Sequence, residues 1–207
     1  MLRNFLLQSW RSLVKHKTYS ILNIAGLSAG LTCFAFIALW VMDELSYDKF
    51  NKNYDQIVRL TGTAKTETGT VKSAQTSAPM AKALKDDYPE IENTVRLDMR
   101  EEIVRHNEQQ FLQSNILIAD PSFFDVFSYR LSKGNTKTAL SEPWSLVLTE
   151  SAASKYFGNA NPIGQTLTMN MYDSNAMGAT YNITGVMPDP VDNAHFKFQM
   201  IASFKTI

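Results

Sequence analysis

The sequence predicts an α+β protein: an N-terminal amphipathic helix and one transmembrane helix, followed by a mixed α/β domain. Two observations predict this organisation. One is an uncharged run from Tyr19 to Met42, which is long enough to cross a membrane as a helix. The other is the alternation of short strand and helix patterns through residues 43–207. With 44% hydrophobic and 19% charged residues, the chain is too apolar to be intrinsically disordered.

The charges divide the chain into two zones. The 20 basic and 20 acidic residues cancel over the whole chain. All charged residues of positions 1–42 are basic, and they are Arg3, Arg11, Lys15 and Lys17. Residues 43–207 are therefore net acidic, and their aromatic residues lie in apolar runs instead of alternating with Lys or Arg. We expect no nucleic-acid partner.

Residues 19–42 are predicted to form the transmembrane helix. At about 1.5 Å per residue the helix is roughly 36 Å long, enough for a hydrocarbon core of about 30 Å. A cleaved signal peptide is the alternative, but its apolar region is usually about 7 to 15 residues long and lies closer to the N-terminus. Because all four basic residues precede the helix, the positive-inside rule places the N-terminus in the cytoplasm. Residues 43–207 are then expected in the periplasm of a bacterium, with the helix in the inner membrane.

Residues 1–18 are predicted to form a cytoplasmic amphipathic helix with a basic flank. The apolar side of this interfacial helix consists of Leu2, Phe5, Leu6, Trp10, Leu13 and Val14. An aromatic ring beside Arg11 and Lys15 suits the headgroup region of a membrane. The alternative is a simple basic flank that only sets the topology.

Gly26 and Gly30 form a GxxxG pair within the predicted membrane helix, and Asn23 and Cys33 lie near the same face. Small residues at this spacing allow a second helix to approach closely. We therefore predict Gly26 and Gly30 as helix-packing residues. Since glycine is common in membrane helices, a chance pair is the alternative.

The first half of the outer domain is predicted from local patterns. A short polar helix is expected at Tyr47–Asn53, followed by a strand with Ile57, Val58 and Leu60. The expected elements after these are a turn at 66–69, a helix beginning near Ser77 and ending before Pro89, and two or three strands between 91 and 119 around a turn at 106–108.

The second half continues the alternation. The sequence PSFFDVF predicts a short aromatic helix whose phenylalanines belong to the core. The later expected elements are a strand at 144–148, a helix capped by Thr149 and ended by Gly158, and strands at 165–171 and 180–186. The methionine-rich segment 169–179 is predicted to be the tip of a hairpin, as a plain turn or as a contact for an apolar partner.

The outer domain carries no pattern typical of an enzyme or a metal site. The phosphate-loop lookalike GNANPIGQT, at 158–166, has five residues between its glycines and no lysine, so it is predicted to be a turn. Cys33 is the single cysteine, and His16, His106 and His195 are too far apart in sequence to share a helix face. We therefore predict no catalytic residue, no cofactor and no metal, and a protein that is not an enzyme.

Five blocks of the sequence, which together cover most of the chain, carry a family resemblance. They are LRNFLLQSWRSLVKHKTYSILNIAGLSAGLTCFAFIALWVMDELSYDKFNKNYDQIVRL at 2–60, APMAKALKDDYPEIE at 78–92, ADPSFFDVFSYRLSKGNTKTAL at 119–140, SLVLTESAASKYFGNANPIGQTL at 145–167 and YNITGVMPDPVDNAHFKF at 181–198. In this order they resemble MacB-like and FtsX-like permease subunits of ABC transporters, especially those of Bacteroidetes-type bacteria.

The resemblance implies a first transmembrane helix and a MacB-like periplasmic core domain, followed by further membrane helices. Because the sequence has one apolar span and ends at Ile207, we expect it to be the N-terminal part of a longer permease. The resemblance also implies a separate cytoplasmic ABC ATPase, a permease dimer, and ATP-driven movements that export or extract a substrate. The alternative is a single-pass membrane protein whose outer domain binds or senses a ligand.

Overall fold

The computed structural model describes residues 8, 10, 11, 13–67, 69–170 and 178–206. The chain forms two compact units, Met1–Tyr47 and Asp48–Ile207, which we call the helical unit and the sheet domain. The boundary between them falls a few residues after the last residue of the long helix α2.

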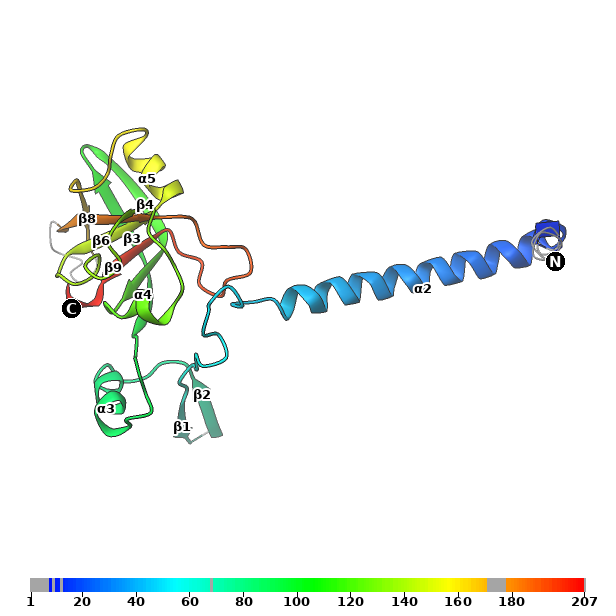
Figure 1. Cartoon of the computed structure of the whole chain (residues 1–207), viewed down its shortest axis with the longest axis horizontal. Coiled ribbons are helices and arrows are strands. Elements are labelled where there is room, and N and C mark those ends of the chain that lie inside the picture. Colours follow the sequence, from blue (N-terminus) through cyan, green and yellow to red (C-terminus); the bar gives the residue numbers. More distant parts are fainter. Residues whose placement is uncertain (1–7, 9, 12, 68, 171–177, 207) are drawn as a thin grey trace. The chain divides into compact units, whose positions relative to one another are not determined.

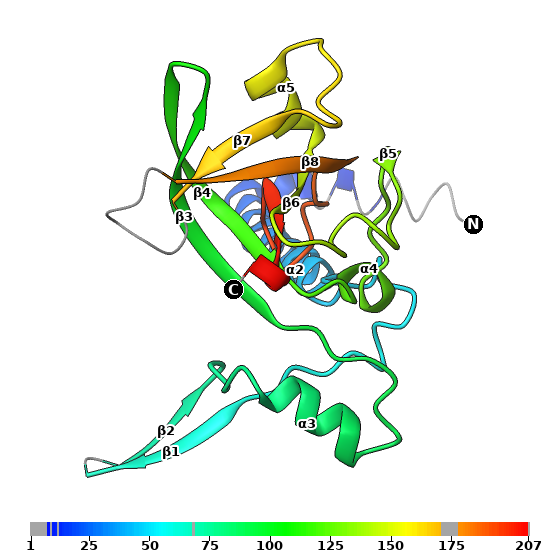
Figure 2. The ribbon, with the colours of Figure 1, turned by 90° about the vertical axis from the view of Figure 1, so that its left-hand side faces the viewer.

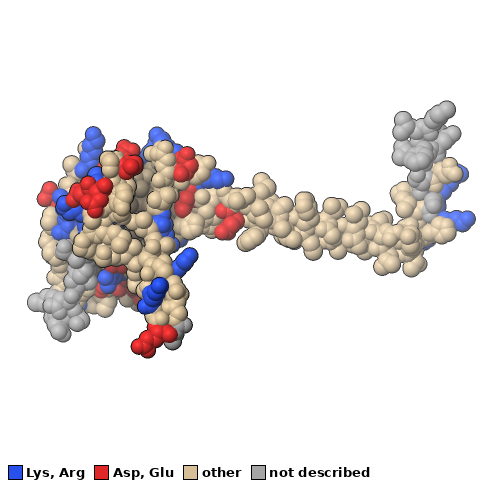
Figure 3. Space-filling model, turned by 90° about the horizontal axis from the view of Figure 1, so that it is seen from below, with Lys and Arg blue, Asp and Glu red and all other residues tan. Residues whose placement is uncertain are grey.

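The helical unit is dominated by α2, Lys17–Glu44, which has 28 residues (Figure 1). The described residues between 8 and 15 are also helical, and a turn at His16 separates them from α2. Within the described part of the chain, α2 is the one helix that could cross a membrane by length and composition. None of its residues is buried. Figure 3 shows the uncharged surface along α2, which ends near the acidic pair Asp43 and Glu44.

The sheet domain is built around one seven-stranded sheet. Its strands are β3 Leu97–His106, β4 Gln109–Ala119, β5 Lys133–Gly134, β6 Ser145–Thr149, β7 Thr166–Met169, β8 Ala179–Met187 and β9 Met200–Ser203. Their order in the sheet is β5-β8-β6-β9-β4-β3-β7. β7 pairs with β3 on one side and with β8 on the other, so the sheet curls and closes (Figure 2). Closure leaves few unpaired strand edges.

Both faces of this sheet are covered by apolar side chains. One cluster contains Val104, Ile116, Ile118, Leu146, Leu148, Leu167, Tyr181, Ile183 and Met200, with Ala152, Tyr156 and Phe157 of α5, Glu150–Phe157. The other contains Leu117, Ala119, Phe127, Val147, Phe198 and Ile201, with Phe123 of α4, Phe123–Val126. Successive residues of β6 point into different clusters, which explains why this strand is a continuous apolar run.

Local signals explain how α5 begins and ends. The side chain of Thr149 accepts a hydrogen bond from the backbone N–H of Ala152 at 3.2 Å, as an N-cap residue does. Gly158 has φ +59° and follows the last helical residue, where a residue with a side chain is disfavoured. The predicted cap and stop of this helix are confirmed.

A smaller part of the sheet domain lies outside the closed sheet. β1, Gly62–Thr66, pairs with β2, Gly69–Ser73, in an antiparallel hairpin, and α3, Met80–Asp87, follows. Figure 2 shows these three elements apart from the closed sheet. No residue of β1, β2 or α3 is buried. The turn predicted at 66–69 closes a hairpin, and the predicted end of the helix before Pro89 is confirmed.

The prediction for residues 47–60 is wrong in two respects. Residues 47–53 form turns and bends, not a helix, and residues 57–60 are not in a strand, since β1 begins at Gly62. The polar groups of Asp48 and Asn51 bond to distant parts of the domain, and this replaces helical hydrogen bonding. The structure also starts β3 at Leu97 instead of 91.

Two strands were not predicted. β5 has two residues and β9 has four, and all residues of β9 are buried. Such short segments show no alternation of apolar and polar residues, which is the pattern that reveals a strand. Residues 171–177, the centre of the predicted methionine-rich hairpin tip, lie outside the described residues, although β7 and β8 on either side do pair.

Candidate functional site: the start of the sheet domain

The predicted helix-packing residues lie on the exposed surface of α2. A methyl group at the Cβ position of either Gly26 or Gly30 would meet no described atom within 4 Å. The face of the helix that carries both glycines therefore has space for a partner, and helix packing stays a prediction. Of the predicted interfacial residues, Trp10 and Leu13 are exposed, whereas Leu2, Phe5 and Leu6 lie outside the described residues.

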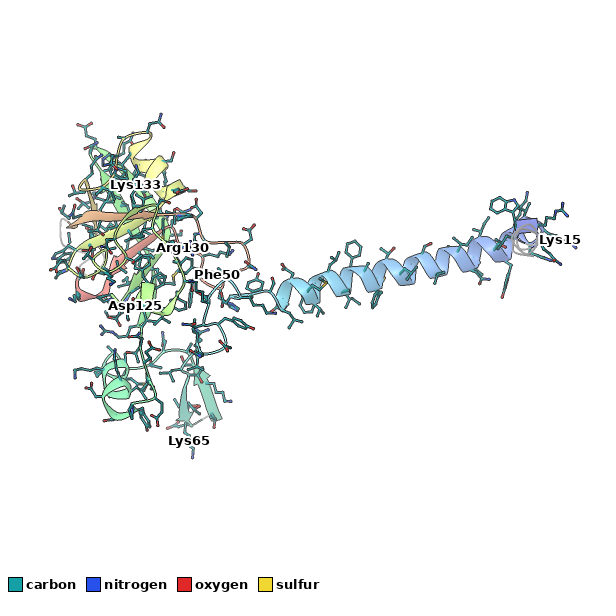
Figure 4. The ribbon with its side chains drawn as sticks, viewed as in Figure 1. Lys15, Phe50, Lys65, Asp125, Arg130 and Lys133 are labelled. Atoms are coloured by element: carbon teal, nitrogen blue, oxygen red, sulfur yellow. The ribbon has the colours of Figure 1, made fainter. Side chains whose placement is uncertain are left out.

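The turn at His16 creates a concave surface within the helical unit. The hydroxyl of Ser20 donates to the carbonyl of Leu13 at 3.1 Å, across the turn. The resulting hollow has a volume of about 580 Å³ and is lined by Leu13, His16, Tyr19, Ser20, Asn23 and Ile24. Lys15 lies at the same end of the unit (Figure 4). The lining of the hollow is mixed polar and apolar, as is usual for a surface at a membrane interface.

The sheet domain begins with a tightly bonded segment, residues 48–52, which we call the anchor turn. Asp48 has a positive φ of 57°. Its backbone N–H donates to the carbonyl of Asn193 at 2.9 Å. Its carboxylate accepts the backbone N–H of His195 at 3.0 Å and lies 2.7 Å from Nδ1 of the same histidine. One residue thus makes three contacts with the loop between β8 and β9.

Asn51 attaches the anchor turn to the segment that follows α4. It is buried, with 2% of its surface exposed. Its side-chain oxygen accepts the backbone N–H of Ser128 at 3.0 Å, and its side-chain nitrogen donates to the carbonyl of Asp48 at 3.1 Å. In return, the hydroxyl of Ser128 accepts the backbone N–H of Lys52 at 2.9 Å. Both polar atoms of the buried amide therefore have a partner.

An aromatic cluster lies beneath these polar contacts. Phe50, labelled in Figure 4, packs edge-on against Tyr129 with ring centroids 5.2 Å apart. Tyr129 also packs against Phe123 at 5.5 Å and Phe198 at 5.4 Å. Burial, and secondly the negative charge of Asp48, raise the pKa of Tyr129. Its buried hydroxyl has no hydrogen-bond partner among the described residues, so the ring is held by packing.

A second polar site lies at Arg96 and Asp120. The guanidinium donates to both carboxylate oxygens of Asp120, at 2.7 and 2.9 Å, and lies 4.0 Å from the ring centre of Phe204. The hydrogen bonds that the guanidinium donates to Asp120 raise the pKa of Arg96. These two residues line a groove of about 380 Å³ beside α3, with Ala78, Pro79, Ala81, Lys82 and Thr94. Because its charge is already paired, Arg96 is suited to holding the fold and not to binding an anion.

A third polar site lies under α5. The side-chain oxygen of Gln113, which is buried, accepts from Lys155 at 2.9 Å and from the hydroxyl of Tyr156 at 3.0 Å. Its nitrogen donates to Gln199 at 2.6 Å. Burial raises the pKa of Tyr156 to about 12. Every polar atom of Gln113 has a partner, so this network fixes α5 on the sheet.

Sequence reasoning found none of these three polar sites. The anchor turn joins residues up to 147 positions apart, and no spacing rule covers such a distance. A signal was nevertheless present, since the blocks at 2–60 and 181–198 were both singled out by their family resemblance. Across the described part of the chain, no three His, Cys, Asp or Glu side chains are placed to hold a metal ion.

Together these features define a class of protein: an apolar helix of membrane-spanning length, followed directly by a domain with a closed α/β sheet. The family comparison narrows the class. Residues 20–207 match the model of the MacB-like periplasmic core domain, and the chain belongs to this family. The match includes both most of α2 and the whole sheet domain. A search of curated proteins finds no match.

Three solved structures are similar to the chain. A domain of a protein described as a permease of Porphyromonas gingivalis is 22% identical, with a TM-score of 0.57 over 71% of this chain and 61% of that one. The periplasmic region of MacB from Actinobacillus actinomycetemcomitans is 20% identical, with a TM-score of 0.44 over 60% of this chain and 53% of that one. The extracellular domain of the noncanonic ABC-type transporter YknZ from Gram-positive bacteria is 16% identical, with a TM-score of 0.47 over 63% of each chain.

The similarity to the P. gingivalis domain supports the fold, because its TM-score, alone among these three, is above 0.5. This chain spans about three fifths of that domain's length. The predicted family and the α+β class with its apolar N-terminal helix are confirmed. The sheet domain is the periplasmic-type domain of a membrane transporter family, and domains of this kind are not themselves enzymes.

Proposed function

We propose that this chain is part of the permease subunit of an ABC transporter of the MacB/FtsX type. A partner ATPase in the cytoplasm hydrolyses ATP, and the resulting movement passes through the membrane to the sheet domain, which then helps to export or extract a substrate. One observation carries this proposal. The family match runs without interruption from residue 20, inside the apolar helix, to the end of the sheet domain.

The proposal assigns a place to each part of the chain. α2 crosses the inner membrane, with residues 1–18 on the cytoplasmic side and residues 43–207 in the periplasm. The four basic residues before the helix and the acidic pair after it support this orientation. Trp10 and Leu13 lie at the cytoplasmic membrane surface near the ATPase. Gly26 and Gly30 pack against another helix of a permease dimer.

The topology is tested with single cysteines in a Cys33→Ala background, which removes the only native cysteine. Lys137→Cys lies on an exposed part of the sheet domain, and Lys15→Cys lies before α2. A membrane-impermeant maleimide applied to the periplasmic side should label Lys137→Cys at once and Lys15→Cys only after the membrane is disrupted. Labelling in the opposite order would overturn the orientation.

Partner binding is tested by co-purification from detergent with the ABC ATPase of the same transporter. The variant Gly26→Leu with Gly30→Leu should still insert into the membrane but lose association with other permease helices, because leucine prevents the close approach of two backbones. Ala25→Leu, on another face of α2, is the matched control. If no ATPase co-purifies with the unmodified chain, a single-pass binding or sensor protein becomes the better interpretation.

A further inference from the structure

The anchor turn differs from the rest of the sheet domain in how it is held. Among the described residues 48–56, none belongs to a helix or strand, and Asn51 is the only one that is buried. Its long-range links run through side chains or single backbone contacts, to Asn193, His195 and Ser128. Strands β4, β6 and β9, in contrast, are joined by continuous backbone ladders. The separate hydrogen bonds of the anchor turn can break while the backbone hydrogen bonds between the strands stay intact.

The links are also individually weak or strained. The side-chain contact of Asp48 with His195 is exposed to solvent, at 38% and 63% of the two side chains, and exposed polar contacts of this kind contribute little to stability. Asp48 adopts a left-handed backbone conformation, which L-residues with a side chain disfavour. This backbone strain is relieved when Asp48 loses its contacts with the β8–β9 loop. The buried amide of Asn51 and the packing of Phe50 against Tyr129 are the contacts that cost more to break. The turn is therefore attached by few contacts, and Asn51 and Phe50 supply the more costly ones.

The two segments that receive the anchor turn are themselves fixed. In the β8–β9 loop, the ammonium group of Lys197 donates to the carbonyls of Val191 and Asp192 at 2.8 and 2.5 Å, and the hydroxyl of Ser151 donates to Asp189 at 2.6 Å. Ser128 follows α4, which is anchored by the fully buried Phe123. The β8–β9 loop and the segment after α4 are therefore each held by contacts other than those with the anchor turn.

Both the β8–β9 loop and the segment after α4 connect to the buried core of the sheet domain. The β8–β9 loop leads directly into β9, whose residues are all buried between β4 and β6. The orange-red loop in Figure 1 lies beside the segment that opens the sheet domain. The anchor turn is also the first segment of the sheet domain after α2 in the sequence.

We propose that the anchor turn is a releasable latch, in which Asp48 and Asn51 hold the start of the sheet domain to the β8–β9 loop and to the end of α4, and release it during the transport cycle. This rests on the proposed function for the cycle, whereas the local release is a property of the fold itself. Asn51 is the main closing residue, and Asp48 with His195 sets the position of the turn.

The local release is tested by hydrogen exchange on the full chain in detergent or lipid nanodiscs. The backbone amides of Asp48, Lys52, Ser128 and His195 should exchange faster than those of Leu117 and Ile201 in the core. Asn51→Ala should speed the exchange of the latch amides by about tenfold or more, with no change at the core amides, because it removes a buried hydrogen-bond partner. Asn53→Ala, at the exposed position directly after the anchor turn, is the matched control. Exchange of latch and core amides at one common rate would overturn the proposal.

The role in the cycle is tested by locking the latch. In the Cys33→Ala background, Asn51→Cys and Ser128→Cys place two thiols at neighbouring positions, since the side chain of Asn51 reaches the backbone of Ser128 and the side chain of Ser128 reaches the backbone of Lys52. Oxidation with copper phenanthroline should lower ATP hydrolysis by the assembled transporter about fivefold, and a reductant should restore it, because a blocked conformational step limits turnover. An active Cys33→Ala transporter that is insensitive to the lock would overturn the latch. No ATPase association in the Cys33→Ala chain would instead overturn the proposed function.

Discussion

α2 and the strands β6 and β9 are similarly apolar, but their side chains have opposite surroundings. No residue of α2 is buried, although it has 28 residues, whereas every residue of β6 and β9 is buried. The strands bury their apolar side chains within the domain, where they pack against α5 on one face and against α4 on the other. α2 satisfies its backbone hydrogen bonds internally and offers its side chains to another medium, which is the requirement for a helix in lipid.

The comparison teaches that the stability of the two units depends on different surroundings. Changes in the closed sheet should act on folding of the sheet domain, and changes in α2 should act on membrane insertion. Four predictions test this separation.

The largest effect is expected in the closed sheet. Ile118→Ala should lower the free energy of unfolding of the sheet domain by about 4 kcal/mol, because it leaves a cavity at a fully buried position. Urea unfolding of the full chain in detergent, followed by tryptophan fluorescence, measures this loss. Val58→Ala is the control at an exposed position, with an expected change below about 0.5 kcal/mol. Equal losses for both variants would contradict the assignment of the core.

The next effect is expected in the membrane helix. Leu31→Arg should disfavour insertion by about 3 kcal/mol, because it places a charge near the centre of α2. The measurement is the fraction of the chain that resists extraction from membranes by alkaline carbonate. Leu31→Ile is the matched control and should remain inserted. Unfolding of the sheet domain in detergent should be the same for all three proteins, and a shared loss would mean that the two units do not act separately.

A smaller effect is expected at the start of α5. Thr149→Ala should lower the free energy of unfolding by about 1 kcal/mol, because the N–H of Ala152 loses its capping partner. Thr149→Ser keeps the hydroxyl and should recover most of this loss. Thermal unfolding monitored by circular dichroism distinguishes the two variants. If serine fails to restore stability, packing of the threonine methyl group is the more important contribution.

The smallest effect concerns alkaline stability. Because burial raises the pKa of Tyr156 from 10.0 to about 12, the folded state holds this proton more tightly than the unfolded state does. The stabilisation is complete below the unfolded value and is lost as the pH rises through this interval. Ultraviolet absorbance of the phenolate should show one tyrosine fewer titrating in this interval in Tyr156→Phe. Loss of a tyrosine that titrates near pH 10, instead of one near pH 12, would contradict the raised pKa of Tyr156.

The sequence was sufficient for the features that depend on neighbouring residues. The uncharged run gave the bounds of the apolar helix to within two residues at each end, since a helix of this kind needs only its own composition. Thr149 and Gly158 gave the limits of α5, and the turn before Gln109 gave the β3–β4 hairpin, because caps and tight turns are local. The ordered blocks gave the family.

Only the tertiary structure decided which distant residues meet. Closure of the sheet through β7, the buried strand β9 and the network around Gln113 depend on side chains that are far apart in the chain. Residues 47–53 carry a plausible helical pattern, but Asp48 and Asn51 gain more from bonding to His195 and Ser128 than from a helical ladder. Local propensity is worth a fraction of a kcal/mol per residue, so long-range contacts determined the structure of the anchor turn.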